Sequence, residues 1–334
     1  MCIVTVGIDL AKNVFAVHGV NAAGQVLLLK PEVKRDKLLA LIASLPPCLI
    51  GMEACSGAHY WAREFQKHGH TVRLIAAQFV TPYRKSSRIK NDAADAAAIC
   101  EAVARPNMRF VPIKSVEQQS QLFIHRARQG YVEHRTALIN RIRGLLSELG
   151  IVLPLVHAQF CKGVHAVLED LPGYSNRVIG DLMSELNQTE HLAQYDQLIA
   201  QIARQDAQAK RLMQIQGVGA TTAIVASIGN GLDFNNGRQF SAWLGLVPKQ
   251  HSSGGKAKLG RITKAGDRYL RTLLVLGARA LLRYAKDKDD PVSRWALALQ
   301  QRRGYGRALV AIAAKNARMC WAALRLGDNF KLPA

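Results

Sequence analysis

The stretch CIVTVGIDL, residues 2–10, is a run of apolar and β-branched residues that ends close to an aspartate. Such a run predicts a buried β-strand with Asp9 at its carboxyl end. Two further strand patterns follow, VFAVHGV at 14–20 and QVLLLK at 25–30, and the turn residues NAAG at 21–24 separate them. Together these patterns predict a three-strand meander at the start of the chain.

Beyond the meander, helix and strand patterns alternate up to about residue 104. We expect a helix over 34–44, a strand over 48–54, a helix over 57–69, a strand over 71–77 and a helix from Asn91 to about Ala104. The resulting order, βββαβαβα, is that of a ribonuclease-H-like domain. We place this α/β domain at residues 1–115.

Four acidic residues occupy positions that this order brings together. Asp9 and Glu53 end the first and fourth strands, which are neighbours in a ribonuclease-H-like sheet. Asp92 and Asp95 begin the last helix, and their spacing puts both on one helical face. Clustered carboxylates raise one another's pKa, and Mg²⁺ with its oxygen ligands relieves this. The sequence therefore predicts a catalytic site with two Mg²⁺ ions, whose ligands are Asp9, Glu53, Asp92 and Asp95.

Each acid alone also has an ordinary interpretation. Asp9 could cap a turn, Glu53 could pair with Arg63 or Lys90, and Asp92 could be favoured by the helix dipole. The stretch GIDLAKN at 7–13 also resembles the first phosphate motif of actin-like sugar kinases. The second phosphate loop and the adenosine motif of those kinases are not found in the sequence, so the joint fit favours the metal site.

The charge of the chain favours a polyanionic partner. The 334 residues carry a formal net charge of +21, with a pI near 10.1. Residues 249–325 hold 18 Lys and Arg against four Asp, a net charge of +14. We expect nucleic acid to be the partner, ahead of an anionic membrane surface.

The cysteines and the apolar runs indicate the compartment. The six cysteines are scattered, with no CxxC pair, which argues against a zinc site and a disulfide framework. No signal peptide precedes the first strand, and no apolar run reaches the ~18 residues that a membrane span needs. We expect a cytoplasmic protein that does not enter a membrane.

The middle region, 116–212, has the pattern of long helices. Residues 117–150 carry apolar side chains at steps of four and three: Leu138, Ile142, Leu145 and Leu149. Residues 188–213 continue this spacing: Leu192, Tyr195, Ile199, Ile202, Asp206, Ala209 and Met213. The spacing predicts a coiled-coil-like region. Two interpretations stay open, a helical hairpin packed on its own domain and a dimerisation arm.

The last region, 213–330, begins with a glycine turn. Gly217 and Gly219 in GVGATTA predict a tight turn, followed by a helix from near Thr221. In a helix-hairpin-helix such a turn points backbone N–H groups at a phosphate. A plain helix-turn-helix with a glycine cap has the same pattern.

Two serines lie in a basic, glycine-rich stretch, HSSGGKAKLGRITKAGDRYLR at 251–271. Ser252 and Ser253 precede two glycines, and we expect the cations that follow to bind nucleic acid: Lys256, Lys258, Arg261, Lys264, Arg268 and Arg271. An exposed serine hydroxyl can accept a phosphoryl group where cations meet the developing charge. A flexible basic loop whose serines only contact solvent is an equal interpretation.

Several motifs together carry a family resemblance: GIDLAKN, MEACSG, KNDAADA, IQGVGATTA, FSAWLGLVPKQHSSGGK and GRITKAGDRYLRTLL. Their order resembles that of transposases of the insertion-sequence-110 family, in particular the 1111-type subgroup, from about residue 3 to 326. The resemblance implies a RuvC-like domain with an Asp-Glu-Asp-Asp metal site, a coiled-coil link and a mainly α transposase domain. It also implies that Ser253, which directly precedes glycine, is the nucleophile, with Ser252 as the alternative.

The resemblance further implies partners and a reaction. Such enzymes recombine double-stranded donor and target DNA and use a structured noncoding (bridge) RNA that pairs with both. A homo-oligomer, dimer or tetramer, is expected. Our first hypothesis is a transposase that forms a phosphoserine intermediate. The alternatives are a metal-dependent, Holliday-junction-type nuclease without a covalent intermediate, and a non-catalytic nucleic-acid-binding protein.

Overall fold

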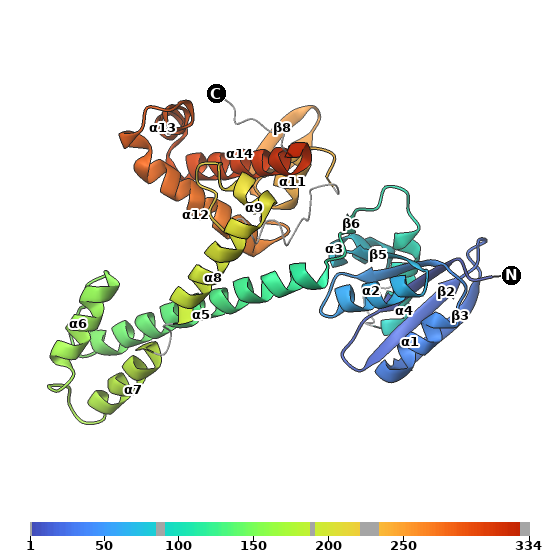
Figure 1. Ribbon diagram of the computed structural model, residues 1–334, viewed down its shortest axis with the longest axis horizontal. Helices are drawn as coiled ribbons and strands as arrows, with labels where there is room; N and C mark the ends of the chain where they lie inside the picture. The colour runs from blue at the N-terminus through green and yellow to red at the C-terminus, as the bar shows by residue number, and fades with distance from the viewer. Residues whose placement is uncertain (1, 85–90, 188–190, 221–233, 328–334) are drawn as a thin grey trace. The chain divides into compact units, whose positions relative to one another are not determined.

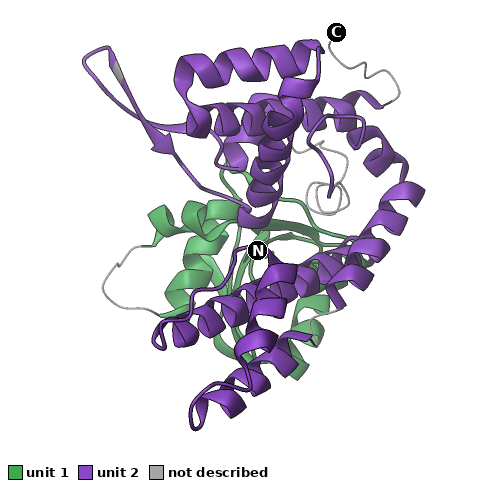
Figure 2. Cartoon of the chain, turned by 90° about the vertical axis from the view of Figure 1, so that its left-hand side faces the viewer, with its two compact units in different colours: residues 1–116 green, residues 117–334 purple. Residues whose placement is uncertain are grey.

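The computed structural model describes residues 2–84, 91–187, 191–220 and 234–327 (Figure 1). The chain forms two compact units, residues 1–116 and 117–334 (Figure 2). The finer division of the sequence at residues 115 and 212 stays a prediction.

Among the described residues of unit 1, six strands form one mixed sheet in the order β3-β2-β1-β4-β5-β6. Their bounds are Thr5–Asp9 (β1), Val14–Val20 (β2), Val26–Lys34 (β3), Leu49–Glu53 (β4), Thr71–Ile75 (β5) and Phe110–Val111 (β6). Strands β1 to β3 form the predicted antiparallel meander, and β4 and β5 run parallel to β1. The predicted α/β class and mixed sheet are confirmed. Strand β6 was not predicted, because two residues are too few to show a period.

Helices pack against both faces of this sheet. They are α1 (Arg35–Ala43), α2 (Ala58–Lys67), α3 (Ala77–Val80), the 3-10 turn η1 (Thr81–Tyr83) and α4 (Asp92–Val103). Alternate strand residues such as Ile8 and Met52 form one core with Leu38 of α1 and Phe65 of α2. On the opposite face, Ile75 of β5 packs with Ile99 and neighbouring residues of α4. Helix α4 therefore lies across the face opposite α1 and α2.

In unit 2, a first core joins α5 (Val116–Ser147), α6 (His157–Val167) and α7 (Ser175–Asn187). From α5, Leu138, Ile142 and Leu146 are buried in this core. Leu145 and Leu149 of the predicted seam are 43% and 42% exposed and take no part in this core. Each step of four turns the buried side of a 3.6-residue helix by about 40°, so Leu146 enters the core although the predicted spacing of four and three places Leu145 there. The coiled-coil-like region stays a prediction. The dimerisation arm stays a prediction.

The second predicted helical segment is divided in two. Helix α8 covers His191–Gln205 and α9 covers Ala207–Leu212. Asp206 lies between them, and its Oδ1 accepts a hydrogen bond of 2.7 Å from the backbone N–H of Ala209. The one polar position of the predicted seam is therefore a helix N-cap.

A second core of unit 2 contains α9, α11 (Gly237–Trp243), α12 (Arg268–Tyr284), α13 (Pro291–Arg303) and α14 (Tyr305–Leu326). Large buried side chains from three of these helices meet there, including Phe240, Leu274 and Ile312. These contacts hold together the part of the chain from which the serine-containing stretch extends.

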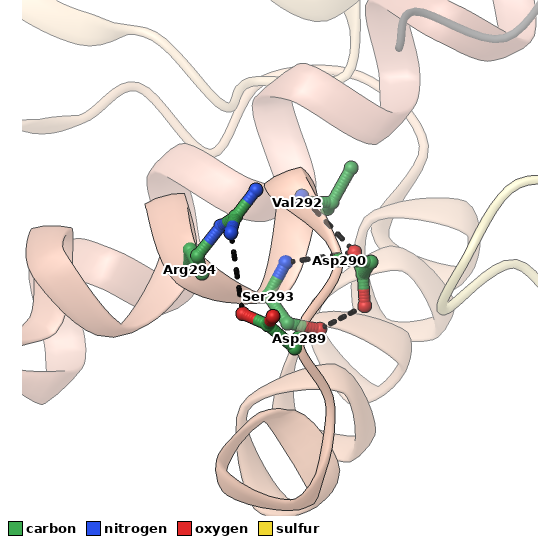
Figure 3. A network of polar contacts seen from close by, with 5 residues as sticks. All are labelled: Asp289, Asp290, Val292, Ser293 and Arg294. Atoms are coloured by element: carbon green, nitrogen blue, oxygen red, sulfur yellow. Dashed lines mark hydrogen bonds and ion pairs between the residues drawn. The ribbon is translucent and has the colours of Figure 1, made fainter.

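Helix α13 shows how local sequence sets an element boundary (Figure 3). Oδ1 of Asp290 accepts hydrogen bonds of 3.0 Å from the backbone N–H groups of Val292 and Ser293. Its Oδ2 accepts a bond of 2.6 Å from the Ser293 hydroxyl. The hydrogen bonds from Ser293 lower the pKa of Asp290 to about 2. The sequence DDPVS therefore starts a helix with Asp290 as the N-cap and proline in the first turn.

Within the described residues, no helix combines the length and apolar character needed to cross a bilayer. The cytoplasmic location stays a prediction.

Candidate metal centre and serine hairpin

Asp9 and Glu53 lie at the same edge of the sheet. Strands β1 and β4 are parallel neighbours, with Ile8 opposite Met52, and each acid is the last residue of its strand. Side chains alternate along a strand, so both acids face the side on which α4 packs. Both are half-buried. The predicted adjacency of the first and fourth strands is confirmed.

Asp92 and Asp95 occupy the first turn of α4. The side chain of Asn91 caps this helix by accepting a hydrogen bond of 3.0 Å from the backbone N–H of Ala93. Asp92 is exposed and Asp95 is 7% exposed. One carboxylate oxygen each from Asp9, Asp92 and Asp95 lies within 4.8 Å of the others. The structure thus brings together three of the four predicted ligands.

Glu53 stands beside this group and is joined to it by an arginine. Arg84 Nη2 lies 3.5 Å from Oε1 of Glu53, and Arg84 Nε lies 2.9 Å from Oδ1 of Asp95. Arg63, one of the suggested partners of Glu53, donates to the Lys114 carbonyl at 2.6 Å, and its pairing with Glu53 stays a prediction. Lys90, the other suggested partner, lies outside the described residues. Arg84 was missed because no periodic pattern marks the segment that carries it.

The electrostatics of the cluster favour a bound cation. Burial, and then the charges of Asp95, Asp92 and Glu53, raise the pKa of Asp9 to about 6, while Arg84 opposes this. Burial also raises the pKa of Glu53, and Arg84 partly offsets that effect. Ionised carboxylates offer only acceptor oxygens, which are the ligands that hard divalent cations prefer. The donor set therefore fits Mg²⁺ or a similar ion.

The serine-containing stretch is a β-hairpin and not the loop that was expected. Strand β7 covers Pro248–Ser253 and β8 covers Lys256–Ile262, with Ser253 opposite Lys256. Gly254 and Gly255 form the turn, with φ values of +56° and +77°. A Gly-Gly pair between two strands is a hairpin signal, and here the many basic residues obscured it.

Both serines are exposed at the end of this hairpin, which extends from the helices of unit 2 (Figure 2). The Ser252 hydroxyl accepts a hydrogen bond of 2.8 Å from the Gln250 side chain. Three of the predicted phosphate-binding cations are exposed on β8, namely Lys256, Lys258 and Arg261. The hairpin thus carries hydroxyl groups and positive charge close together.

The other predicted cations differ in their surroundings. Lys264 and Arg268 are exposed, and Arg268 is the first residue of α12. Arg271 is half-buried, and its Nη1 donates to the carbonyl oxygens of Leu244 (3.0 Å) and Ala265 (2.8 Å). Its guanidinium therefore joins the backbone that precedes β7 to the backbone that follows β8. The contact of Arg271 with nucleic acid stays a prediction.

The two glycines of the predicted turn also differ. Gly217 has a φ of +79°, and a Cβ there would lie 2.6 Å from the carbonyl oxygen of Gly277 in α12. Around Gly219, no atom of the described residues lies within 4 Å of where a Cβ would be. The close approach to α12 explains Gly217 by packing alone. The helix predicted from Thr221 lies outside the described residues, and the helix-hairpin-helix stays a prediction.

Comparison with known proteins agrees with these features. Residues 6–151 match the DEDD_Tnp_IS110 family, described as transposase, and residues 209–292 match a family described as "Transposase IS116/IS110/IS902 family". The chain is 47% identical over 330 residues to a Pseudomonas aeruginosa protein named "Probable family 20 transposase", covering 96% of each chain. It is 42% identical over 335 residues to the Coxiella burnetii "Transposase for insertion sequence element IS1111A", covering 98% of this chain and 91% of that protein.

The acidic cluster and these similarities define an enzyme of the transposase class, which acts on DNA by transesterification. The chain belongs to the IS110 family of insertion-sequence transposases, with IS1111-type relatives.

Proposed function

We propose that this transposase cuts and joins DNA through a covalent bond to Ser253, at a site where Asp9, Glu53, Asp92 and Asp95 hold Mg²⁺. The observation that carries the proposal is the meeting of Asp9, Asp92 and Asp95 within 4.8 Å of one another. Two bound Mg²⁺ ions would supply Lewis-acid stabilisation of the charge on the phosphodiester. A ribonuclease-H-like assignment of unit 1 is supported by the order β3-β2-β1-β4-β5 and by α4 across β1.

In the proposed first step, the Ser253 oxygen attacks the phosphorus atom. A bond between Oγ and phosphorus forms, the bond from phosphorus to one deoxyribose oxygen breaks, and that oxygen leaves with a proton. The serine proton passes to a carboxylate or to water. In the second step, a hydroxyl of another DNA end attacks the phosphoserine, and Ser253 regains its proton. Each step exchanges one phosphoester for another, so no nucleotide hydrolysis is needed.

The partners of the reaction are proposed on the same basis. Double-stranded donor and target DNA and a structured noncoding RNA suit the net charge of +14 over residues 249–325 and the exposed cations of β8. A homo-oligomer, dimer or tetramer, is supported by the exposed apolar side chains of Leu145 in α5 and Leu149 in the turn that follows it. A helix-hairpin-helix at Gly217 and Gly219 is proposed from the sequence GVGATTA.

An adduct assay tests the proposal. The full chain is incubated with labelled element-end DNA, Mg²⁺ and RNA transcribed from the element end, and then run on a denaturing gel. We expect a protein–DNA adduct in the wild type and in Ser252→Ala. We expect none in Ser253→Ala, in Asp9→Asn or with a chelator present. An adduct that persists in Ser253→Ala and disappears in Ser252→Ala assigns the role to Ser252. Unjoined DNA ends with no adduct at any time favour the nuclease alternative.

A further inference from the structure

Arg84 joins two acidic side chains that the fold brings from different elements. Its Nε lies 2.9 Å from Oδ1 of Asp95 on α4, and its Nη2 lies 3.5 Å from Oε1 of Glu53 on β4. The arginine itself follows the 3-10 turn η1. One guanidinium therefore spans the two carboxylates, as its fork of N–H donors allows.

The burial of the three groups is unequal. The Asp95 and Glu53 side chains are 10% and 17% exposed, whereas the Arg84 side chain is 35% exposed. A buried carboxylate close to a half-buried one is costly unless a cation offsets their charges. Arg84 supplies that charge from the solvent side, so it can leave without unpacking the core.

A divalent cation at this cluster would bind the same negative charge that Arg84 neutralises, the charge of the carboxylates. Asp95 contributes an oxygen to the cluster with Asp9 and Asp92 and is also the closer partner of Arg84. Two cations at one carboxylate repel each other, so binding of a metal ion and binding of the guanidinium oppose each other.

We propose that Arg84 takes the place of the metal ion in the metal-free protein and, once the metal displaces it, binds a phosphate of the DNA backbone. The proposal rests on the metal site of the proposed function. The displaced guanidinium remains beside that site, and its planar fork matches two phosphate oxygens. Arg84 is thus a residue that couples metal loading to phosphate binding.

The first half of the proposal is tested by metal titration without DNA. Mn²⁺ binding to the full chain is measured by electron paramagnetic resonance for the wild type, Arg84→Gln, Arg84→Lys and Arg105→Gln. Arg105 is the matched control, because it also pairs with a carboxylate of α4, Glu101, at 2.6 Å. We expect Arg84→Gln to bind Mn²⁺ about tenfold more tightly and Arg105→Gln to bind as the wild type does.

Arg84→Lys keeps the positive charge but lacks the planar set of N–H donors that lets arginine bind two carboxylates at once. Its affinity for Mn²⁺ should therefore lie between those of the wild type and Arg84→Gln. This variant also serves if Arg84→Gln does not fold. Unchanged or weaker Mn²⁺ binding in the folded Arg84 variants would overturn the proposal.

The second half is tested by DNA binding as a function of salt, with Ca²⁺ in place of Mg²⁺ to prevent reaction. We expect Arg84→Gln to bind DNA about tenfold more weakly and to reduce the slope of log affinity against log salt by about one. Arg84→Lys should restore the slope. Equal affinity and slope in Arg84→Gln and the wild type would overturn this half.

Failure of this proposal is distinguishable from failure of the metal site itself. If the wild type binds no Mn²⁺, or if Asp9→Asn binds it equally well, the metal site of the proposed function is wrong. If the wild type binds Mn²⁺ and Asp9→Asn does not, the metal site stands. The comparison of Arg84→Gln with Arg105→Gln then decides the role of Arg84.

Discussion

Gly7 of β1 lies directly opposite Gly51 of β4, and both face helix α4. A Cβ at Gly7 would lie 2.1 Å from the carbonyl oxygen of Ala96, and one at Gly51 would lie 2.7 Å from Cβ of Val103. No side chain of the sheet therefore separates it from the helix at this pair, and the backbone and side chains of α4 lie directly on the two glycines. Because its first turn carries Asp92 and Asp95, this close approach sets the distance of both aspartates from Asp9.

Gly7→Ala should move α4 away from the sheet. An added methyl group in so tight a contact costs about 1–3 kcal/mol of stability in unit 1. We expect faster hydrogen exchange over residues 92–103 and weaker Mn²⁺ binding. Gly130→Ala on α5 is the control, since its Cβ would meet no atom of the described residues within 4 Å and alanine favours the helix. Unchanged exchange over 92–103 in Gly7→Ala would show that the contact does not hold the helix.

Asp9→Asn should stabilise the metal-free protein at neutral pH. The pKa of Asp9 is about 6 in the folded chain against an ordinary value of 3.8. Between these values the folded state binds more protons than the unfolded state, so Asp9 makes the fold less stable as pH rises. Asparagine carries no charge, so we expect a gain of about 1–3 kcal/mol above pH ~6 that vanishes below pH ~4.

Urea unfolding of the metal-free protein at several pH values measures this effect, with the exposed Glu32→Gln as control. Added Mn²⁺ should reverse the order, because it binds the folded wild type and stabilises it by mass action. A loss of stability in metal-free Asp9→Asn at neutral pH would contradict the electrostatic account of the cluster.

Arg271→Ala and Arg268→Ala should have different effects although the two residues are close in sequence. Removing the Arg271 guanidinium leaves the carbonyl oxygens of Leu244 and Ala265 without that donor, which costs about 2–3 kcal/mol. We expect a lower melting temperature and faster hydrogen exchange over residues 244–266. Arg268 is exposed, so Arg268→Ala should keep the stability and reduce the salt slope of DNA binding by about one. Equal melting temperatures for the two variants would refute this distinction.

The turn of the serine hairpin offers a test of backbone geometry. Gly255 has a φ of +77°, which β-branched residues adopt only with strain of about 1–2 kcal/mol. Gly255→Val should therefore lower the yield of the protein–DNA adduct several-fold, while Gly255→Asn should retain it because asparagine tolerates this conformation. Circular dichroism melting checks that the helices are unaffected. Wild-type adduct yield in a folded Gly255→Val protein would mean that the turn does not control the reaction.

Local patterns predicted the α/β unit and most of its acidic cluster. Strand alternation and connection order are properties of short segments, and they suffice to put Asp9 beside Glu53. The role of Arg84 could not be predicted in this way. Arg84 lies in a segment without a helix or strand period, and its ion pairs depend on where its long side chain extends in the folded chain. The burial of Leu146 and the exposure of Leu145 could not be predicted from the helix period, because the two side chains lie about 40° and 60° to either side of Ile142 and the packed helices decide between them.

Among the strands that the structure describes, β7 and β8 form a sheet of two, and every residue of β7 is exposed. A two-stranded ribbon without a buried face has little stability of its own in water. We therefore expect the molecule that the hairpin contacts to fix the position of the Ser253 hydroxyl. If that molecule is DNA, substrate binding would orient the proposed nucleophile, and a chain without substrate would hold it in no fixed orientation.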